Sequence, residues 1–269
     1  AQRLKKRLKP ESAGAGLLLA SLVLLFFLTA GSIASVSIWG LALLLLLLNV
    51  GLFWQGAACK LPIIAIAGMI LSWIILGVLW ANVSLSAILM PALVVMAGFA
   101  LLVLAGNIWM QRRATGGDIF LLGNGLLLGL AGHVFLIAIA AQKDLCIPPW
   151  PLLGILLLLN LAVGVAALYT RRDTLHRAAM AASGFILIVW VNVAELIPWP
   201  DVAVFSAGAF ALFSLIWIYL AKRVGTDAAP FSQTAAITLI IGQFVTVFAS
   251  AQYGTPFMEF LLTAHLLFL

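Results

Sequence analysis

The chain has 269 residues, of which 65% are hydrophobic and only 8% charged, and its mean hydropathy is +1.23. Globular domains are roughly half apolar and a quarter charged, so this composition excludes a soluble domain, a disordered chain and a disulfide scaffold. The net charge of +6 lies in short basic clusters between apolar runs rather than in a stripe with interleaved aromatic residues. Nucleic acid is therefore excluded as a partner, and we expect an all-α, polytopic transmembrane protein whose main partner is the lipid bilayer.

Apolar runs long enough to cross a membrane follow one another along the whole chain. A spanning helix needs about 20 apolar residues, and Pro, Gly and Asn residues separate the runs. We expect a basic cytoplasmic segment over residues 1–13 and a transmembrane domain over residues 14–269 that belongs to a longer protein. The boundary between the first two spans is the least marked, because Leu17–Trp54 carries no charge. The domain has about ten expected spans, near 14–31, 36–56, 62–80, 86–110, 118–141, 150–170, 177–198, 202–221, 231–251 and from 257 onward.

The basic residues predict the orientation of these spans. If the amino terminus is cytoplasmic, all of the 14 Lys and Arg residues except Lys143 lie on the cytoplasmic side, as the positive-inside rule requires. We therefore expect a multi-pass protein of the bacterial cytoplasmic (inner) membrane. The two cysteines, Cys59 and Cys146, then lie on opposite sides of the bilayer and cannot form a disulfide.

A helical hairpin with a basic end recurs along the chain. A Leu-Leu-Leu-Leu-Asn run ends at Asn49 and again at Asn160, and a basic residue follows eleven positions later in both cases. Trp73 and Trp190 come next, at spacings that match if a charged loop over residues 171–177 has six extra residues. The pattern predicts tandem duplication of hairpins. The basic ends are at Lys60, Arg112, Arg171 and Lys222.

Residues 153–193, and more loosely 41–82, resemble the repeating hairpin of a large bacterial family known only as predicted membrane proteins of unknown function. The resemblance rests on the Leu-Leu-Asn run, the basic turn and the Trp, and it covers about a third of the chain. It implies many tandem spans and brings no catalytic residues. The expected number of spans is also similar to that of drug and metabolite transporters.

Polar side chains inside the spans are the remaining signal, because a polar group in hydrocarbon is costly unless it is paired or faces water. We interpret four asparagines as interhelical hydrogen-bond partners that fix packing. Gly125 and Gly129 are interpreted as a small-residue packing face in the fifth span. The asparagines are Asn49, Asn107, Asn124 and Asn160.

Five other polar residues fall within about 12 Å of the outer boundary, at 1.5 Å per residue. We hypothesise that they line one crevice that opens outward and binds a ligand, a lipid or a partner. A snorkelling carboxylate is the simpler interpretation of the glutamate at 195, and packed core histidines are the simpler interpretation of the two histidines, which lie at matching depths. Haem ligation by both histidines is the alternative, and no metal or other cofactor is expected. The residues are His133, Asn192, Glu195, Glu259 and His265.

The chain has none of the HExxH, GxSxG or DxD motifs of hydrolases and metal-dependent transferases, which favours a protein that is not an enzyme. The leading hypothesis is a non-catalytic membrane domain or complex subunit that associates with other membrane subunits. A transporter or flippase for a small or lipid-like molecule is the alternative. A membrane-embedded enzyme or haem-binding subunit is the third possibility.

Overall fold

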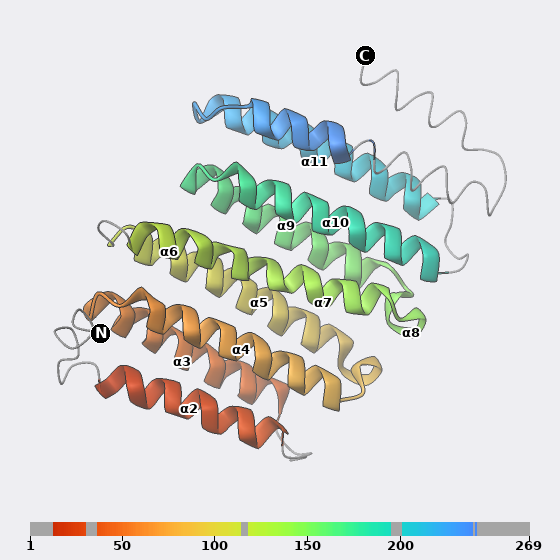
Figure 1. Ribbon diagram of the computed structural model, residues 1–269. Coiled ribbons are helices and arrows are strands. Elements are labelled where there is room, and N and C mark those ends of the chain that lie inside the picture. The colour runs from red at the N-terminus through yellow and green to blue at the C-terminus, as the bar shows by residue number, and fades with distance from the viewer. Residues whose placement is uncertain (1–12, 31–36, 114–117, 195–200, 239, 241–269) are drawn as a thin grey trace. The chain divides into compact units, whose positions relative to one another are not determined.

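The computed structural model describes residues 13–30, 37–113, 118–194, 201–238 and 240, with the backbone alone for 118–121 and 201–211. This part of the chain forms helices joined by short turns and contains no strand. The helices are α2 (Ala13–Ala30), α3 (Ile38–Ala58), α4 (Pro62–Asn82), α5 (Leu85–Gln111), α6 (Asp118–Gly125), η2 (Leu126–Leu130), α7 (Ala131–Ala140), α8 (Lys143–Cys146), α9 (Trp150–Thr170), α10 (Asp173–Val193) and α11 (Asp201–Arg223), as Figure 1 shows. Residues 229–238 are also helical.

Seven helical segments in the described part of the chain are long and apolar enough to cross a membrane, namely α2, α3, α4, α5, residues 122–140, α9 and α10. They correspond to the first seven expected spans. The eighth expected span is the helix α11, and 229–238 covers the first part of the ninth. The expected span from 257 onward lies outside the described residues. The predicted all-α class is therefore confirmed for the described residues, and seven apolar helices support a multi-pass membrane protein. The count of about ten spans and the cytoplasmic amino terminus stay predictions.

Large apolar side chains point outward along these helices. On α3, the side chains of Leu43, Leu47, Val50 and Trp54 are exposed at intervals of three or four residues, so they form one continuous stripe along the helix. An apolar stripe of this kind is typical of a surface that faces lipid rather than water.

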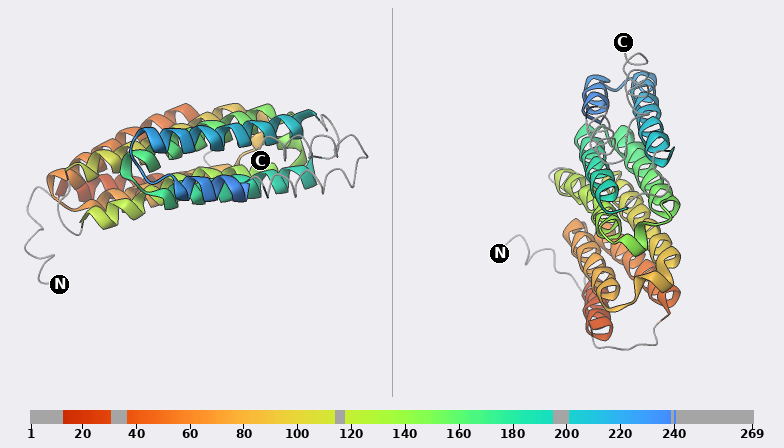
Figure 2. Two further views of the ribbon diagram at one scale, coloured as in Figure 1. Left: turned by 90° about the horizontal axis from the view of Figure 1, so that it is seen from above. Right: turned by 90° about the vertical axis from the view of Figure 1, so that its right-hand side faces the viewer.

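The contacts divide the chain into two compact units, unit 1 up to Gly132 and unit 2 from His133. In unit 1, α2 packs against α3 and α4, and α5 packs against α3, α6 and η2. In unit 2, α9 packs against α10 and α11. Figure 2 shows that the helices within each unit run alongside one another, which is how consecutive hairpins bury their shared faces.

The turns α3–α4 and α9–α10 have the same backbone geometry. Each reverses direction at a basic residue in the left-handed region, Lys60 with φ 55° and Arg171 with φ 53°. The next amide donates to a carbonyl five residues back, from Leu61 to Gly56 and from Arg172 to Ala167, at 2.9 Å in both turns. This Schellman arrangement satisfies the last carbonyls of the first helix.

This compact turn corrects the expected start of the seventh span. We expected a charged loop over residues 171–177, but α10 begins at Asp173, so His176 and Arg177 lie inside the helix. Asp173 is a favourable first residue because its charge complements the positive helix terminus, and it forms an ion pair with Arg177 one turn later. A search for apolar runs misses a helix whose first turn is charged. The α9–α10 turn also lacks the six extra residues that we expected relative to the α3–α4 turn.

Candidate functional site

A buried asparagine links the two helices of the α3–α4 hairpin. The side-chain amide of Asn49 donates to the backbone oxygen of Leu45, at 2.8 Å, and to the hydroxyl of Ser72 on α4, at 2.7 Å. Asn49 and Ser72 are both buried. The bond therefore joins two helices inside the apolar packing, where a polar group needs a partner.

The α9–α10 hairpin contains the same pair. The side-chain amide of Asn160 donates to the backbone oxygen of Leu156, at 3.0 Å, and to the hydroxyl of Ser183 on α10, at 2.9 Å. The Ser183 hydroxyl also lies 3.1 Å from the other amide atom, Asn160 Oδ1. Asn160 lies 111 positions after the asparagine of the first hairpin, and Ser183 lies 111 positions after its serine. The two hydrogen bonds thus occupy equivalent places in two hairpins.

An aromatic ring packed on a glycine joins neighbouring hairpins within each unit. In unit 1, the ring of Phe53 on α3 lies against Gly106 on α5, where a Cβ would overlap the ring. In unit 2, the ring of Trp217 on α11 lies against Gly164 on α9, with the same overlap. The positions of these contacts are again 111 residues apart, with the large and small residues exchanged.

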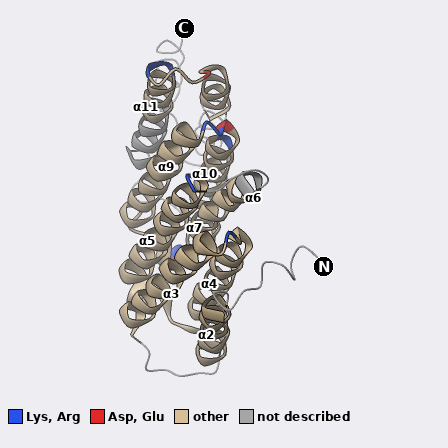
Figure 3. Cartoon of the chain, turned by 90° about the vertical axis from the view of Figure 1, so that its left-hand side faces the viewer, with Lys and Arg blue, Asp and Glu red and all other residues tan. Residues whose placement is uncertain are grey.

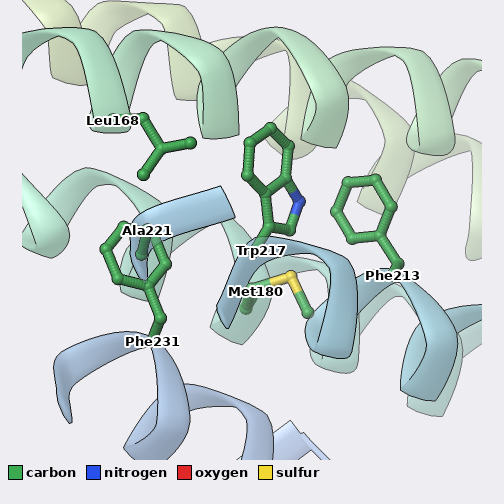
Figure 4. Packing of buried hydrophobic residues seen from close by; sticks show 6 residues of the cluster. All are labelled: Leu168, Met180, Phe213, Trp217, Ala221 and Phe231. Carbon is green, nitrogen blue, oxygen red and sulfur yellow. The ribbon is translucent and has the colours of Figure 1, made fainter. Parts of the chain in front are cut away.

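Trp217 is the centre of a buried apolar cluster in unit 2 (Figure 4). The ring of His176 lies 6.0 Å from the Trp217 ring and 4.9 Å from the Phe231 ring, measured between centroids. His176 is buried, so it packs between aromatic rings rather than lying in a solvated loop. The other members of the cluster are Leu168, Met180, Phe213 and Ala221.

Asn107 joins α5 to two other helices of unit 1. Its side-chain amide donates to the Val103 backbone oxygen at 2.8 Å, to Met69 Sδ at 3.2 Å and to the Gly125 backbone oxygen at 3.4 Å. A Cβ on Gly129 would come within 2.6 Å of the Leu104 side chain on α5.

Two of our interpretations of the bilayer-embedded polar residues are confirmed by these contacts. Gly125 and Gly129 form a packing face, and three of the four asparagines hold helices together. The same interpretation of the fourth asparagine is wrong, because the side chain of Asn124 is exposed rather than packed between helices.

The outward-facing crevice stays a prediction. Glu195, Glu259 and His265 lie outside the described residues. His133 on α7 is fully buried, as the packed-histidine interpretation requires. Asn192 on α10 is exposed, and its amide donates to the backbone oxygen of Ile188 at 2.7 Å.

The described part of the chain shows no group of three or more residues that could hold a metal ion. It does contain a hollow of about 310 Å³ on unit 1, between α3, α4 and α5. No ionisable side chain lines this hollow, so it offers no group for catalysis. Its lining includes Trp39, Leu43, Leu46, Val94, Gly98 and Phe99.

No protein-family model, curated protein or solved structure matches the chain. The resemblance of residues 153–193 to a family of membrane proteins therefore stays a prediction. The proposals below are based on the contacts within the two units.

Proposed function

We propose that the chain is a non-catalytic structural domain of a membrane complex, built from two tandem copies of a two-hairpin unit. One observation carries the proposal: the buried amides Asn49, Asn107 and Asn160 all bond to neighbouring helices. Polar groups inside a bilayer commonly mark transport or catalytic pathways. Here these groups hold helices together instead.

The register of 111 residues supports the tandem copies. It relates the Asn–Ser bonds, the aromatic–glycine contacts, and the left-handed turn residues Lys60 and Arg171. It also relates two buried methionines, Met69 and Met180. Leucine-rich helices resemble one another by composition, but shared contacts at a constant spacing are specific to a repeated structure.

The repeat also supports the proposed topology. Adding 111 residues to α3 and α4 leads to α9 and α10, with four predicted spans per copy. An even number of spans gives both copies the same orientation in the membrane, so Lys60 and Arg171 lie on one side. By the positive-inside rule we propose that this side faces the cytoplasm, and that the membrane is the inner membrane of a bacterium.

Purification from native membranes in a mild detergent tests the structural role. We expect membrane subunits to co-purify in a fixed ratio, and we expect protein-containing liposomes to flip fluorescent phospholipids no faster than empty liposomes. An Asn160→Ala variant should lose thermal stability. Isolation of a single stable chain with lipid-flipping activity would contradict the proposal.

A transporter or flippase is the second candidate, and the two-copy plan favours it, because many transporters consist of repeats with their substrate site at the repeat interface. Transport requires polar groups that face a pathway, whereas the buried asparagines Asn49, Asn107 and Asn160 bond to neighbouring helices. A variant that keeps its stability but loses flipping or uptake would identify a transport residue and favour this candidate.

A further inference from the structure

We propose that the ends of α3 and α5 form a binding site for an anionic phospholipid, whose phosphate is bound by Arg113. The guanidinium carbon of Arg113 lies 4.3 Å from the centroid of the Trp109 ring. Trp109 in turn stacks on Trp54 of α3, with ring centroids 6.2 Å apart and an interplanar angle of 21°. A guanidinium and two indoles thus form one stack across two neighbouring helices.

The stack marks the level of the lipid headgroups. Arg113 follows the last turn of α5, and its amide donates to the backbone oxygen of Met110 at 3.0 Å. A guanidinium is strongly disfavoured in hydrocarbon, whereas indole rings prefer the membrane interface. Trp54 is 63% exposed, so the stack faces the surrounding lipid and does not lie inside the protein.

The geometry leaves the N–H edges of the guanidinium for a ligand. The indole of Trp109 covers one face of the guanidinium of Arg113, and its donors point outward in the guanidinium plane. A planar guanidinium fixed in this way can donate two parallel hydrogen bonds to a phosphate. The ring contact holds the side chain in place, which lowers the entropic cost of binding.

The charge balance of this region favours an anion. Residues 13–113 contain three basic residues, Lys60, Arg112 and Arg113, and no Asp or Glu, and Asp118 begins the next helix. At the α9–α10 turn, by contrast, Arg177 forms an ion pair with Asp173. Figure 3 shows the acidic residue beside the basic ones at that turn. Among the described side chains, the guanidinium of Arg113 thus contacts an aromatic ring, whereas that of Arg177 contacts a carboxylate.

An apolar surface adjoins the charged end, which indicates a ligand with hydrocarbon chains. On α3, the exposed side chains of Val50 and Leu47 lie on the same face of the helix as Trp54. On α5, the exposed side chain of Leu101 lies two turns before Trp109. A phosphate bound at the stack therefore has its chains along two apolar helices. Free phosphate or a soluble anionic protein would leave this surface unused.

Unit 2 has a related but weaker arrangement. Arg223 lies over Tyr219 at the end of α11, with its guanidinium carbon 5.7 Å from the ring centroid. Its Nε donates to the Tyr219 hydroxyl at 2.9 Å, so one of its donors is already used. We expect anionic lipid to bind less tightly here than at Arg113.

The test is lipid titration of the full chain purified in a neutral detergent, followed by native mass spectrometry and by the shift in melting temperature. Phosphatidylglycerol should bind and raise the melting temperature, whereas phosphatidylcholine and inorganic phosphate should not. Arg113→Gln should weaken phosphatidylglycerol binding about fivefold, since one cation near an anionic surface contributes roughly 1 kcal/mol. Trp109→Leu should weaken it as well.

Arg177→Gln is the matched control, because it also removes one positive charge, from an arginine that is already paired. It should leave the affinity unchanged, and Arg223→Gln should reduce it less than Arg113→Gln does. Equal effects of Arg113→Gln and Arg177→Gln would overturn the site, since they would show a response to net charge alone. A shift produced by inorganic phosphate alone would overturn the assignment to a lipid.

Discussion

The contact between neighbouring hairpins is built differently in the two units. In unit 1, a phenylalanine on the first hairpin, Phe53, fills the space above Gly106 of the second. In unit 2, the glycine is on the first hairpin, Gly164, and the second supplies Trp217. The interface therefore needs one large ring and one residue without a side chain, and either helix can supply either part. Close packing constrains the summed volume across an interface more strongly than the identity of each residue.

The largest expected effect comes from exchanging the pair in unit 1. Gly106→Trp alone should overpack the interface and lower stability by about 1–3 kcal/mol, and Phe53→Gly alone should leave a cavity. The double variant reproduces the arrangement of unit 2 and should recover more than half of the combined loss. The measurement is the melting temperature of the four proteins in one detergent.

Gly98→Ala is the control for the glycine substitutions, because no atom lies within 4 Å of the added Cβ. It should have little effect or raise stability slightly, since alanine favours helix. A double variant whose loss equals the sum of the single losses would show that the two positions do not form one contact.

A smaller effect is expected from the buried asparagines. Hydrogen bonds between membrane helices contribute about 1 kcal/mol, so Asn49→Ala and Asn160→Ala should both lower the melting temperature by a few degrees. The loss should be larger in unit 2, because both amide atoms of Asn160 face Ser183, whereas Asn49 Oδ1 has no partner among the described residues.

Asn124→Ala provides the baseline, since that side chain is exposed. Double variants with Ser72→Ala and Ser183→Ala should show that each asparagine acts through its serine. If Asn124→Ala lowers stability as much as the buried substitutions, the bonds to Ser72 and Ser183 do not hold the hairpins together.

The smallest effect concerns the first residue of the second helix in each hairpin. Unit 1 has Pro62 and unit 2 has Asp173 at positions 111 residues apart. Proline suits a first helical position because no helical bond is lost there, and aspartate suits it through its charge. Asp173→Pro and Pro62→Asp should each change stability by less than about 0.5 kcal/mol, since exposed ion pairs within a helix contribute little.

A melting-temperature series with Asp173→Ala tests this equivalence. The melting temperature with alanine at position 173 should be slightly lower than with either aspartate or proline. A large loss with Asp173→Pro would mean that α10 does not begin at residue 173 in the membrane.

The helices themselves were predictable because lipid selects long apolar runs whatever their detailed sequence. The buried face of each helix was not. On α3, leucines occupy both the buried positions, such as Leu45 and Leu52, and the exposed ones, such as Leu43 and Leu47, so no amphipathic period exists to read. Three of the asparagines and the glycines Gly125 and Gly129 were informative instead, because each of them packs closely against a neighbouring helix.

The repeat was predicted in outline but with a wrong register. We matched Trp73 with Trp190 and inserted six residues, whereas the serine at 72 aligns with the serine at 183 without insertion. Trp73 and Trp190 are both buried but have different surroundings, since Trp73 packs edge-on against Phe99 whereas Trp190 donates to the backbone oxygen of Cys146. The shared residue type therefore does not mark equivalent positions, whereas the hydrogen-bonded serines do. Of the five residues predicted to line the crevice, only His133 and Asn192 lie among the described residues. The crevice therefore stays a prediction.

The orientation of the two copies can be tested by thiol labelling, but the native cysteines alone do not suffice. Cys146 is buried, and burial raises the pKa of its thiol above the ordinary value, so it reacts slowly on either side of a membrane. Gln142, at the same loop, is exposed and is a better probe position. Cys59 is partly exposed, and Thr170 occupies the equivalent position in unit 2.

The most direct test of the two-copy account is therefore the side from which three thiols react with an impermeant maleimide: native Cys59, Thr170→Cys and Gln142→Cys, the last two in a Cys59→Ala background. Two parallel copies with cytoplasmic basic ends predict that Gln142→Cys reacts in intact cells. Cys59 and Thr170→Cys should both react only after the membrane is permeabilised. Reaction of Cys59 and Thr170→Cys from opposite sides would contradict the account, because copies with an even number of spans cannot be inverted relative to each other.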